Sequence, residues 1–402
     1  MDKWKTTCLV AGGGPAGMML GYLLARSGVQ TLLVEKHGDF LRDFRGDTVH
    51  PSTTDLMHEL GILDEFLREV PHQTIEQLGI GFKGQTFDLI DFRHLPTARK
   101  YVVFMPQWDF LSFLTTRASR YRPFKLRMQA EVVDLLREDE RVVGLSATTP
   151  DGPLEVRASL VIGADGRHSV VRAQASLQVN EFGAPMDVLW FGLSRRPTDP
   201  EASMGRFDVG RIFVALNRGE YWQCGFVIPK GSIEQTRAKG LPAFRSAVAQ
   251  LAPFAADRVC ELEDWNAINL LTVRVDRLTR WYRPGLLCIG DAAHAMSPVG
   301  GVGINLAIQD AVAAANLLAA PLREGRLAID DLRRVQCRRM LPTRITQRMQ
   351  LFIQNRIIHR VLGSTDKLPL PFAVKLLARF PLVRRVPARL IGVGIRPEHV
   401  RA

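Results

Sequence analysis

The stretch TCLVAGGGPAGMMLGYLLARSGVQTLLVE, residues 7 to 35, decides the fold of this chain. Residues 7 to 11 form a short apolar run of the kind that becomes a buried strand, and a glycine-rich turn at 12 to 17 opens an apolar periodic helix. A second apolar run at 31 to 34 ends on an acid, Glu35. This order predicts a βαβ unit at the start of an α/β domain.

The glycine-rich turn has the spacing G-x-G-x-x-G of a dinucleotide site. Its first glycine permits the tight turn, its second lets a pyrophosphate approach the backbone, and its third lets the helix pack closely on the strand. The helix N-terminus favours the anion, and the acid after the second strand accepts hydrogen bonds from a ribose. The motif alone does not choose between FAD and NAD. The predicted cofactor contacts of this unit are Gly12, Gly14, Pro15, Ala16, Gly17, Glu35 and Lys36.

A second motif lies in LVIGADGRHSVVR, residues 160 to 172. A buried strand leads into an Asp165-Gly166 turn, and Ser169 and Arg172 follow on a short helix. An Asp-Gly turn alone is ordinary structure, but the fixed spacing to the serine and arginine makes the combination more specific.

A third motif begins IGDAAHAMSPVGGVGIN, at residues 289 to 305. The carboxylate of Asp291, at the end of a strand, is placed to accept hydrogen bonds from a polyol chain. Gly300, Gly301 and Gly303 leave backbone N–H groups uncovered, and the apolar helix that follows points its positive end at the loop. Such a loop suits a ligand that gains negative charge, as a flavin does on reduction.

The three motifs together resemble the single-component FAD-dependent monooxygenases of the p-hydroxybenzoate hydroxylase type, over residues 5 to 320. The resemblance implies bound FAD, NADH or NADPH as co-substrate, and transfer of one atom of O₂ through a flavin C4a-hydroperoxide. The implied substrate is an aromatic, phenolic or polyketide-like small molecule. The implied fold class is α/β, with a Rossmann-like FAD-binding domain, an interleaved antiparallel-sheet substrate domain and a C-terminal helical region.

The resemblance also assigns residues and domains. Arg45 is placed near the pyrophosphate, Gln107 near the ribityl-phosphate part, Asp165 at FAD and the nicotinamide cofactor, and Asp291 at the ribityl chain. The loop against the flavin ring comprises Pro298, Gly303, Ile304 and Asn305, and further cofactor contacts are expected at Arg172, Gly290 and Gly301. The expected FAD-binding domain spans 1–75, 100–180 and 280–320, the substrate domain spans 76–99 and 181–279, and a basic helical tail spans 321–402.

The chemistry belongs to the flavin, so no side chain is assigned a catalytic role. We find no metal-ligand spacing and no Ser/His/Asp set in the sequence, and His294 is interpreted as a residue packed by its loop. Substrate contacts are expected from residues 210 to 231 and from the flavin loop. These candidates are Phe213, Trp222, Gln223, Phe226 and Pro298, although alternating apolar residues in a strand more often form core.

Composition is that of a globular protein: 402 residues, 46% apolar and 23% charged, which predicts about two domains. We see no signal peptide and no apolar run of the roughly 18 residues that a spanning helix needs, so a cytoplasmic location is expected. Five cysteines without metal spacing are expected to be reduced and mostly buried.

The net charge of +12 is concentrated at the end of the chain, since residues 341 to 402 hold twelve Arg or Lys against two acids. The charge therefore does not indicate nucleic-acid binding. The tail is compatible with contact to an anionic membrane or an acidic partner, or with a solvated helical hairpin whose arginines face outward. A monomer or a homodimer is expected.

Three rival functions differ from this interpretation. Flavin halogenases carry a Trp-x-Trp-x-Ile-Pro segment, whereas YWQCGFVIP, residues 221 to 229, has Cys224 at the place of the second tryptophan. A reductase of the geranylgeranyl reductase type shares the first motif but not the complete second and third ones. An interaction protein that keeps FAD only as a structural element is the third alternative.

Overall fold

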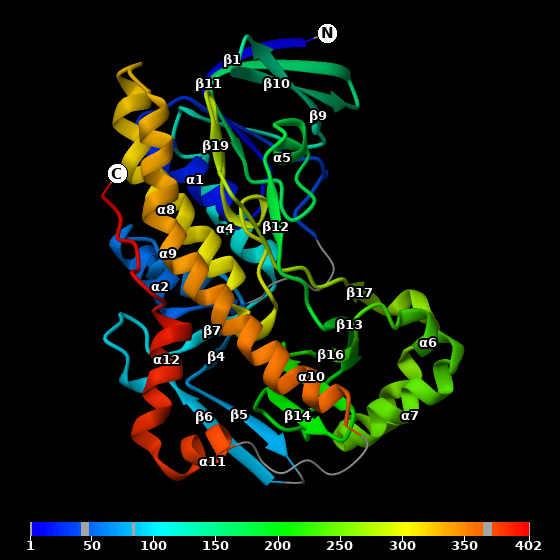
Figure 1. Ribbon diagram of the computed structural model, residues 1–402. Coiled ribbons are helices and arrows are strands. Elements are labelled where there is room, and N and C mark those ends of the chain that lie inside the picture. Colours follow the sequence, from blue (N-terminus) through cyan, green and yellow to red (C-terminus); the bar gives the residue numbers. More distant parts are fainter. Residues whose placement is uncertain (1, 42–47, 83–84, 365–371, 402) are drawn as a thin grey trace.

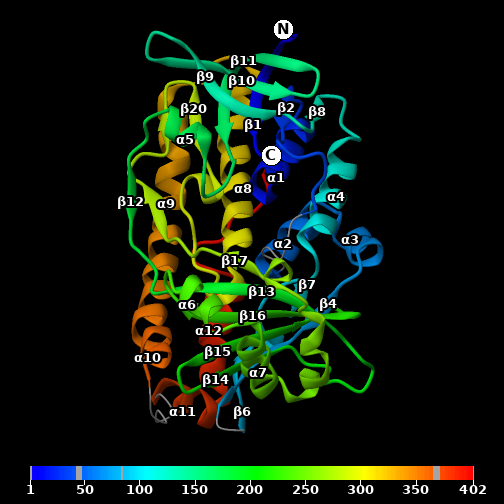
Figure 2. The same ribbon diagram turned by 90° about the vertical axis from the view of Figure 1, so that its right-hand side faces the viewer.

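The computed structural model describes residues 2–41, 48–82, 85–364 and 372–401 (Figure 1). Two sheets stand one above the other, and long helices run alongside both (Figure 2). The fold is α/β with a Rossmann-like nucleotide-binding part and a separate, mostly antiparallel sheet, which confirms the predicted fold class.

The nucleotide-binding sheet has eight strands, and its central path runs β19-β20-β11-β1-β2-β8. Its middle strands pair in parallel, as the βαβ pattern requires, while β9 and β10 extend β11 as antiparallel strands. The strands are β1 (Asp2–Ala11), β2 (Thr31–Val34), β8 (Phe124–Arg127), β9 (Glu131–Glu138), β10 (Arg141–Thr149), β11 (Gly152–Gly163), β19 (Tyr282–Arg283) and β20 (Leu286–Cys288). Helix α1 (Pro15–Arg26) packs against α4 (Gln107–Ala118) and α8 (Gly303–Arg323).

The second sheet has the order β17-β13-β16-β15-β14-β5-β6 and is antiparallel except for the β14–β5 pair. Its strands are β5 (Gln77–Phe82), β6 (Gln85–Asp91), β13 (Met186–Ser194), β14 (Met204–Asp208), β15 (Arg211–Asn217), β16 (Tyr221–Pro229) and β17 (Asn269–Leu271). Helices α6 (Ile233–Ala238) and α7 (Leu241–Leu251) lie on one side of it (Figure 1). The remaining described strands form two small sheets. One has the order β3 (Thr48–Val49), β7 (Val102–Phe104) and β4 (Gln73–Ile75), and the other pairs β12 (Val179–Glu181) with β18 (Asp276–Leu278).

The C-terminal helices connect the two sheets. Helix α9 (Ile329–Ile353) packs on α8, continues through a π-helical turn, η6 (Gln354–Ile358), and reaches the second sheet as α10 (His359–Leu362) (Figure 1). Helices α11 (Phe372–Arg379) and α12 (Arg385–Gly392) cover β6, and the chain end returns to α8 and α9.

The sequence pattern predicts one helix from Ser52 to about Val70 with Ser52 as its cap, and the structure differs in both respects. Residues 52 to 70 form two helices, α2 (Pro51–Glu59) and α3 (Leu63–Glu69), because Gly61 adopts a left-handed backbone with φ +71° and ends the first helix. Ser52 is not the cap, since His50 precedes Pro51 at the first helical position.

Among the residues that the structure describes, one helix, Val299–Arg323, is long and apolar enough to cross a membrane by length and composition, contrary to the expectation from the sequence. Because 72% of its apolar window is buried inside the protein, its composition fits that of a core helix.

Candidate active site

Four adjacent parallel strands end at one edge of the nucleotide-binding sheet, and a motif residue follows each strand. Gly12 follows β1, Glu35 follows β2, the Asp165 turn follows β11, and Gly290 follows β20 after one residue. Ligands of open α/β sheets bind at this carboxyl edge. Motifs separated by up to about 280 residues in the sequence therefore meet in one place.

The three glycines of the first motif have different surroundings. A β-carbon at Gly12, whose φ is +105°, would lie 2.5 Å from the Ala164 carbonyl oxygen, and one at Gly17 would lie 2.0 Å from the Gly12 carbonyl oxygen. These two glycines are required by close backbone packing. A β-carbon at Gly14 would meet nothing within 4 Å, so the backbone at the start of α1 faces open space. This is the arrangement that a pyrophosphate needs, and the residues fit FAD.

Glu35 is held by backbone donors at the end of β2. Its Oε2 accepts from the Gly13 amide at 2.8 Å and its Oε1 accepts from the His37 amide at 3.1 Å. The side chain is buried, whereas the neighbouring Lys36 is exposed. The carboxylate is thus fixed beside the glycine turn before any ligand binds.

The second motif forms a compact turn. Asp165 accepts from the Ser169 hydroxyl at 2.5 Å and from the Val171 amide at 3.1 Å, while Ser169 caps α5 (Val170–Gln174) by accepting from the Arg172 amide. Burial raises the pKa of Asp165, although these hydrogen bonds oppose the shift. The guanidinium of Arg172 is directed at Asp276, 3.3 Å away, so cofactor contact by Arg172 stays a prediction.

The third motif joins two helix N-termini. Gly290 has φ +59°, and a β-carbon there would lie 3.1 Å from the Cβ of Ala16 in α1 and 3.2 Å from the Cβ of Ala307 in α8. The next residue, Asp291, is partly exposed and lies 3.5 Å from the Arg167 guanidinium of the second motif. A carboxylate with free surface beside two helix N-termini is suited to holding a hydroxylated chain.

The predicted flavin loop is tied to the segment around β3. Asn305 accepts from the His50 amide at 2.8 Å and from the Thr53 hydroxyl at 2.7 Å, and its amide donates to the Thr48 carbonyl at 3.1 Å. The Thr48 hydroxyl donates to the carbonyl of Gly301. Asn305 therefore has a structural role that its sequence motif did not indicate, and its contact with the flavin stays a prediction.

His294 belongs to a buried charge network and is 1% exposed. Its Nε2 lies 2.5 Å from Asp310, whose other oxygen accepts from Arg339 at 2.9 Å; Arg339 also lies 3.2 Å from Glu398. Burial alone would raise the pKa of Asp310, but His294 and Arg339 outweigh it and hold this pKa below its ordinary value. These contacts support the interpretation of His294 as a packed residue.

The aromatic substrate candidates require a correction. Phe213, Trp222 and Phe226 are buried in the apolar cluster that contains Phe244 of α7, and the Trp222 indole donates to Asp199 at 2.9 Å. They point to the helix-covered face of the second sheet, because strand side chains alternate between faces. They are therefore core residues. Gln223 lies on the opposite face, where it accepts from Arg218 at 2.8 Å.

Other predicted contacts are placed but not tested. Gln107 is the first residue of α4, Pro298 precedes the short turn η5 (Val299–Gly301), and Gly303 and Ile304 begin α8. Arg45 lies outside the described residues.

One feature of this edge could not be anticipated from the motifs. Buried glutamines of α9 and η6, namely Gln347, Gln350 and Gln354, hydrogen-bond to residues 295 to 299, the segment that leads into the flavin loop. Their three- and four-residue spacing was visible in the sequence, but glutamine spacing alone does not predict burial.

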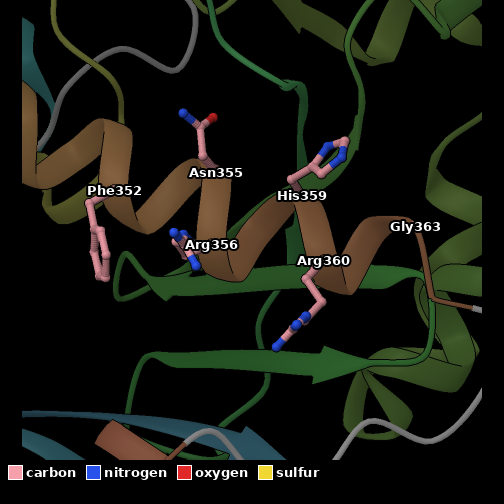
Figure 3. Close-up of a pocket in the computed structure, with 6 residues that line it drawn as sticks. All are labelled: Phe352, Asn355, Arg356, His359, Arg360 and Gly363. Atoms are coloured by element: carbon pink, nitrogen blue, oxygen red, sulfur yellow. The ribbon is translucent and has the colours of Figure 1, made fainter.

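A cavity of about 600 Å³ lies elsewhere, along the end of α9, η6 and α10. Figure 3 shows that its described lining comes from one helix: Phe352, Asn355, Arg356, His359, Arg360 and Gly363. None of these residues belongs to the three motifs, so this cavity is distinct from the cofactor site.

Comparison with known proteins agrees with this geometry. Residues 5–338 match the FAD binding domain family. A 6-methylpretetramide 4-monooxygenase from Streptomyces rimosus is 32% identical over 403 residues, covering 100% of this chain and 95% of the relative. A dialkyldecalin synthase from Streptomyces rugosporus is 29% identical over 79% of this chain, which spans 66% of that relative.

A crystal structure of pqsL, a probable FAD-dependent monooxygenase from Pseudomonas aeruginosa, superposes with a TM-score of 0.75 at 20% identity, over 89% of this chain and 98% of the other. That likeness shows the fold. The chain therefore belongs to the FAD binding domain family. Within it, the chain is an FAD-dependent monooxygenase of the p-hydroxybenzoate hydroxylase type, as the resemblance predicted.

Proposed function

We propose that this enzyme uses NADH or NADPH and O₂ to insert one oxygen atom into an aromatic, phenolic or polyketide-like small molecule. The observation that carries the proposal is the convergence of three FAD motifs at one sheet edge. Full-length similarity to a pretetramide monooxygenase supports the substrate class. The domain division at residues 1–75, 100–180 and 280–320, with 76–99 and 181–279 as the substrate domain, follows the two sheets and is part of the proposal, as is a cytoplasmic location.

The chain's own residues position the cofactor. The bare backbone at Gly14 would receive the pyrophosphate, Glu35 the adenosine ribose, and Asp291 the ribityl chain. When bound and reduced, FAD would supply the chemistry that activates O₂ and delivers one of its two oxygen atoms to the substrate. The N-terminus of α8 would stabilise negative charge on the reduced ring, and the loop before it would exclude water from the reacting atoms.

The substrate is proposed to lie between the flavin loop and the face of the second sheet that carries Gln223. Val299 and Trp190 pack against the apolar cluster of this face, which includes Val227. The buried Nε1 of Trp190 has no hydrogen-bond partner in the described structure and lies on a side chain packed over Gly225. An indole donor on the same sheet face as the Gln223 amide suits a substrate with aromatic rings and oxygen acceptors.

The test is turnover with labelled oxygen. The holoenzyme is supplied with NADPH or NADH and a panel of phenols and polycyclic aromatic polyketides, under ¹⁸O₂. One ¹⁸O atom in the product and faster oxidation of the reductant with that substrate are expected. Oxidation of the reductant under nitrogen with reduction of the organic substrate would instead identify the reductase alternative, which the relatives do not favour.

A non-oxidative activity is the second candidate, because one relative is named a synthase. Conversion of a substrate to an isomer without O₂ or a nicotinamide cofactor would identify it. Loss of ¹⁸O incorporation in every condition, together with such an isomer, would overturn the monooxygenase assignment for this chain.

A peripheral contact of the basic tail with an anionic membrane is also proposed. Large apolar side chains are exposed around α11 and α12, including Phe380 at 52% and Leu382 at 68%. Arg379, Arg385 and Arg389 are beside them, and no acid in the described part of the chain forms an ion pair with these three arginines. Exposed apolar groups flanked by cations are typical of interfacial helices.

Vesicle flotation tests this contact, with 30% phosphatidylserine against neutral vesicles and the F380S/L382S double variant as comparison. Co-flotation only with anionic vesicles, lost in the double variant, is expected. Binding to an acidic protein without flotation would show that this surface contacts a protein partner and not a membrane. A dimer that dissociates in the double variant would show that the surface serves self-association.

A further inference from the structure

The side of α9 that faces the flavin loop is buried but polar. Gln347 and Gln350 are each 1% exposed, and Gln354, at the start of η6, is fully buried. Residues three and four apart share one face of a helix, so the three amides point at the same neighbouring segment. A buried glutamine without partners is unfavourable, so the hydrogen bonds of these amides offset the cost of their burial, and among the described residues only the Oε1 of Gln354 is left without a partner in this set.

Gln350 contacts the segment as a neighbouring strand would. Its Oε1 accepts from the Ser297 amide at 3.1 Å, and its Nε2 donates to the carbonyls of Ser297 at 2.9 Å and Val299 at 3.0 Å. One side chain thus satisfies both the donor and the acceptor of a single loop residue. This fixes the backbone directly on either side of Pro298.

Gln354 and Gln347 extend the contact in both directions. Gln354 donates to the Ser297 hydroxyl at 2.5 Å. Gln347 donates to the carbonyls of Ala295 at 3.2 Å and Asp276 at 2.7 Å. The segment between His294 and the predicted flavin loop is therefore aligned along the helix by side-chain amides.

The same helix continues to the second sheet. The π-helical turn follows directly after α9, and a π-turn adds a residue and so rotates the positions that come after it. Ile358, the last residue of the π-helical turn, and Val361 of α10 enter the apolar cluster that contains Val227 of β16 and packs against Val299. One continuous helix thus holds the flavin loop by amides and the substrate sheet by apolar contacts.

We propose that Gln350 and Gln354 are positioning residues for the reaction: they set the place of the flavin loop relative to the second sheet, through the helix α9–η6–α10. The inference rests on the proposed function, because it takes Pro298 to Asn305 as the loop at the flavin ring. Its consequence is that these amides act on the flavin without touching it.

Gln336 provides a matched control. It lies eleven residues before Gln347, about three turns, on the same helix face. It also clamps a loop, accepting from the Trp281 amide at 3.0 Å and donating to the Thr279 carbonyl at 2.9 Å, but this loop precedes β20 and has no part in the flavin loop.

The experiment compares Gln350→Met with Gln336→Met in the FAD-loaded enzyme, since methionine keeps the length of the side chain and removes the amide. Both variants are expected to lose thermal stability. Only Gln350→Met is expected to change the rate of anaerobic flavin reduction by the nicotinamide cofactor that the wild-type enzyme uses, by about fivefold, the factor that corresponds to the net free energy of one ordinary hydrogen bond. A shift of the flavin midpoint potential and of its visible spectrum should accompany this change.

Equal flavin kinetics, potential and spectrum in the two variants, at equal FAD content, would overturn the inference. If Gln350→Met does not fold, Gln354→Met and Ser297→Ala replace it, because each removes one side of the Gln354–Ser297 hydrogen bond, and Ser297→Ala also removes the hydroxyl that accepts from the Val299 amide. Their effects on the reduction rate should be non-additive in the double variant, and additive effects would again overturn the inference. Absence of FAD from the wild-type protein would instead contradict the proposed function, so the two failures are distinguishable.

Discussion

Helices α8 and α9 pack against each other, yet they are buried by different kinds of side chain. In α8 the buried positions are mainly small and apolar, with Ala311, Ala314 and Ala315 fully buried. In α9 the buried positions include Arg339, Gln347 and Gln350. The first helix is held by close packing, and the second by directed hydrogen bonds and ion pairs, which also fix the loops that it contacts.

The largest loss of stability is expected from the buried charge network that joins Arg339 of α9 to Asp310 and Glu398. Arg339→Met removes the buried cation that joins Asp310 to Glu398, so that Asp310 keeps only His294 and Glu398 keeps only Arg338 as a charged partner. Breaking a buried pair in this way lowers the free energy of unfolding by about 3 to 5 kcal/mol. Urea denaturation of the two proteins measures the difference. A loss below about 1 kcal/mol would mean that packing, as in α8, holds this helix as well.

A pH effect should come from His50, which links the N-terminus of α8 to α12. Its Nδ1 donates to the Ile391 carbonyl at 2.7 Å, and burial lowers the pKa of His50 from 6.5 to about 4. Because the unfolded chain takes up this proton first, the free energy of unfolding falls as pH drops through 6.5 and levels off near 4. The expected loss is about 3 kcal/mol.

Denaturation at a series of pH values in wild type and His50→Gln measures this contribution. The variant should lose stability at pH 7 but should show a shallower decline between pH 6.5 and 4. An identical slope in both proteins would exclude His50 as its source.

Near the N-terminus of α8, substitutions of Asp291 and His294 should have different effects on FAD binding. Asp291→Ala is expected to weaken FAD binding about tenfold or more, because a charged hydrogen-bond acceptor is lost. His294→Ala should lose stability, since its partner Asp310 is buried, but should keep FAD. Titration of the apoprotein with FAD measures both. Normal FAD affinity in Asp291→Ala would remove the central support for the cofactor site.

The smallest effect is expected from added volume in α8. Ala311→Leu inserts three carbon atoms into a closely packed face and should lower the free energy of unfolding by about 1 to 3 kcal/mol. Leucine at the exposed Arg344 of α9 is the control and should change stability by less than about 0.5 kcal/mol. Equal losses at both positions would contradict the difference between the two helices.

Sequence patterns predicted those parts of the site that depend on local geometry. The glycine spacing after β1, the acid after β2 and the Gly-Asp pair after β20 each follow a buried strand, and strand ends meet at one edge in any parallel sheet. The aromatic residues of β15 and β16 were predicted to contact the substrate, but they lie in the core under α7. The prediction failed because alternation in a strand does not reveal which face of the sheet a helix will cover.

The sequence by itself determined the nucleotide-binding fold, the FAD motifs and the buried character of α8, because strand–turn–helix geometry and apolar periodicity are properties of neighbouring residues. Only the tertiary structure decided how α9 is used. Its glutamines and arginines are typical of a solvated helix, and they become buried only because Ser297, Asp310 and Glu398, distant along the chain, supply the matching polar groups.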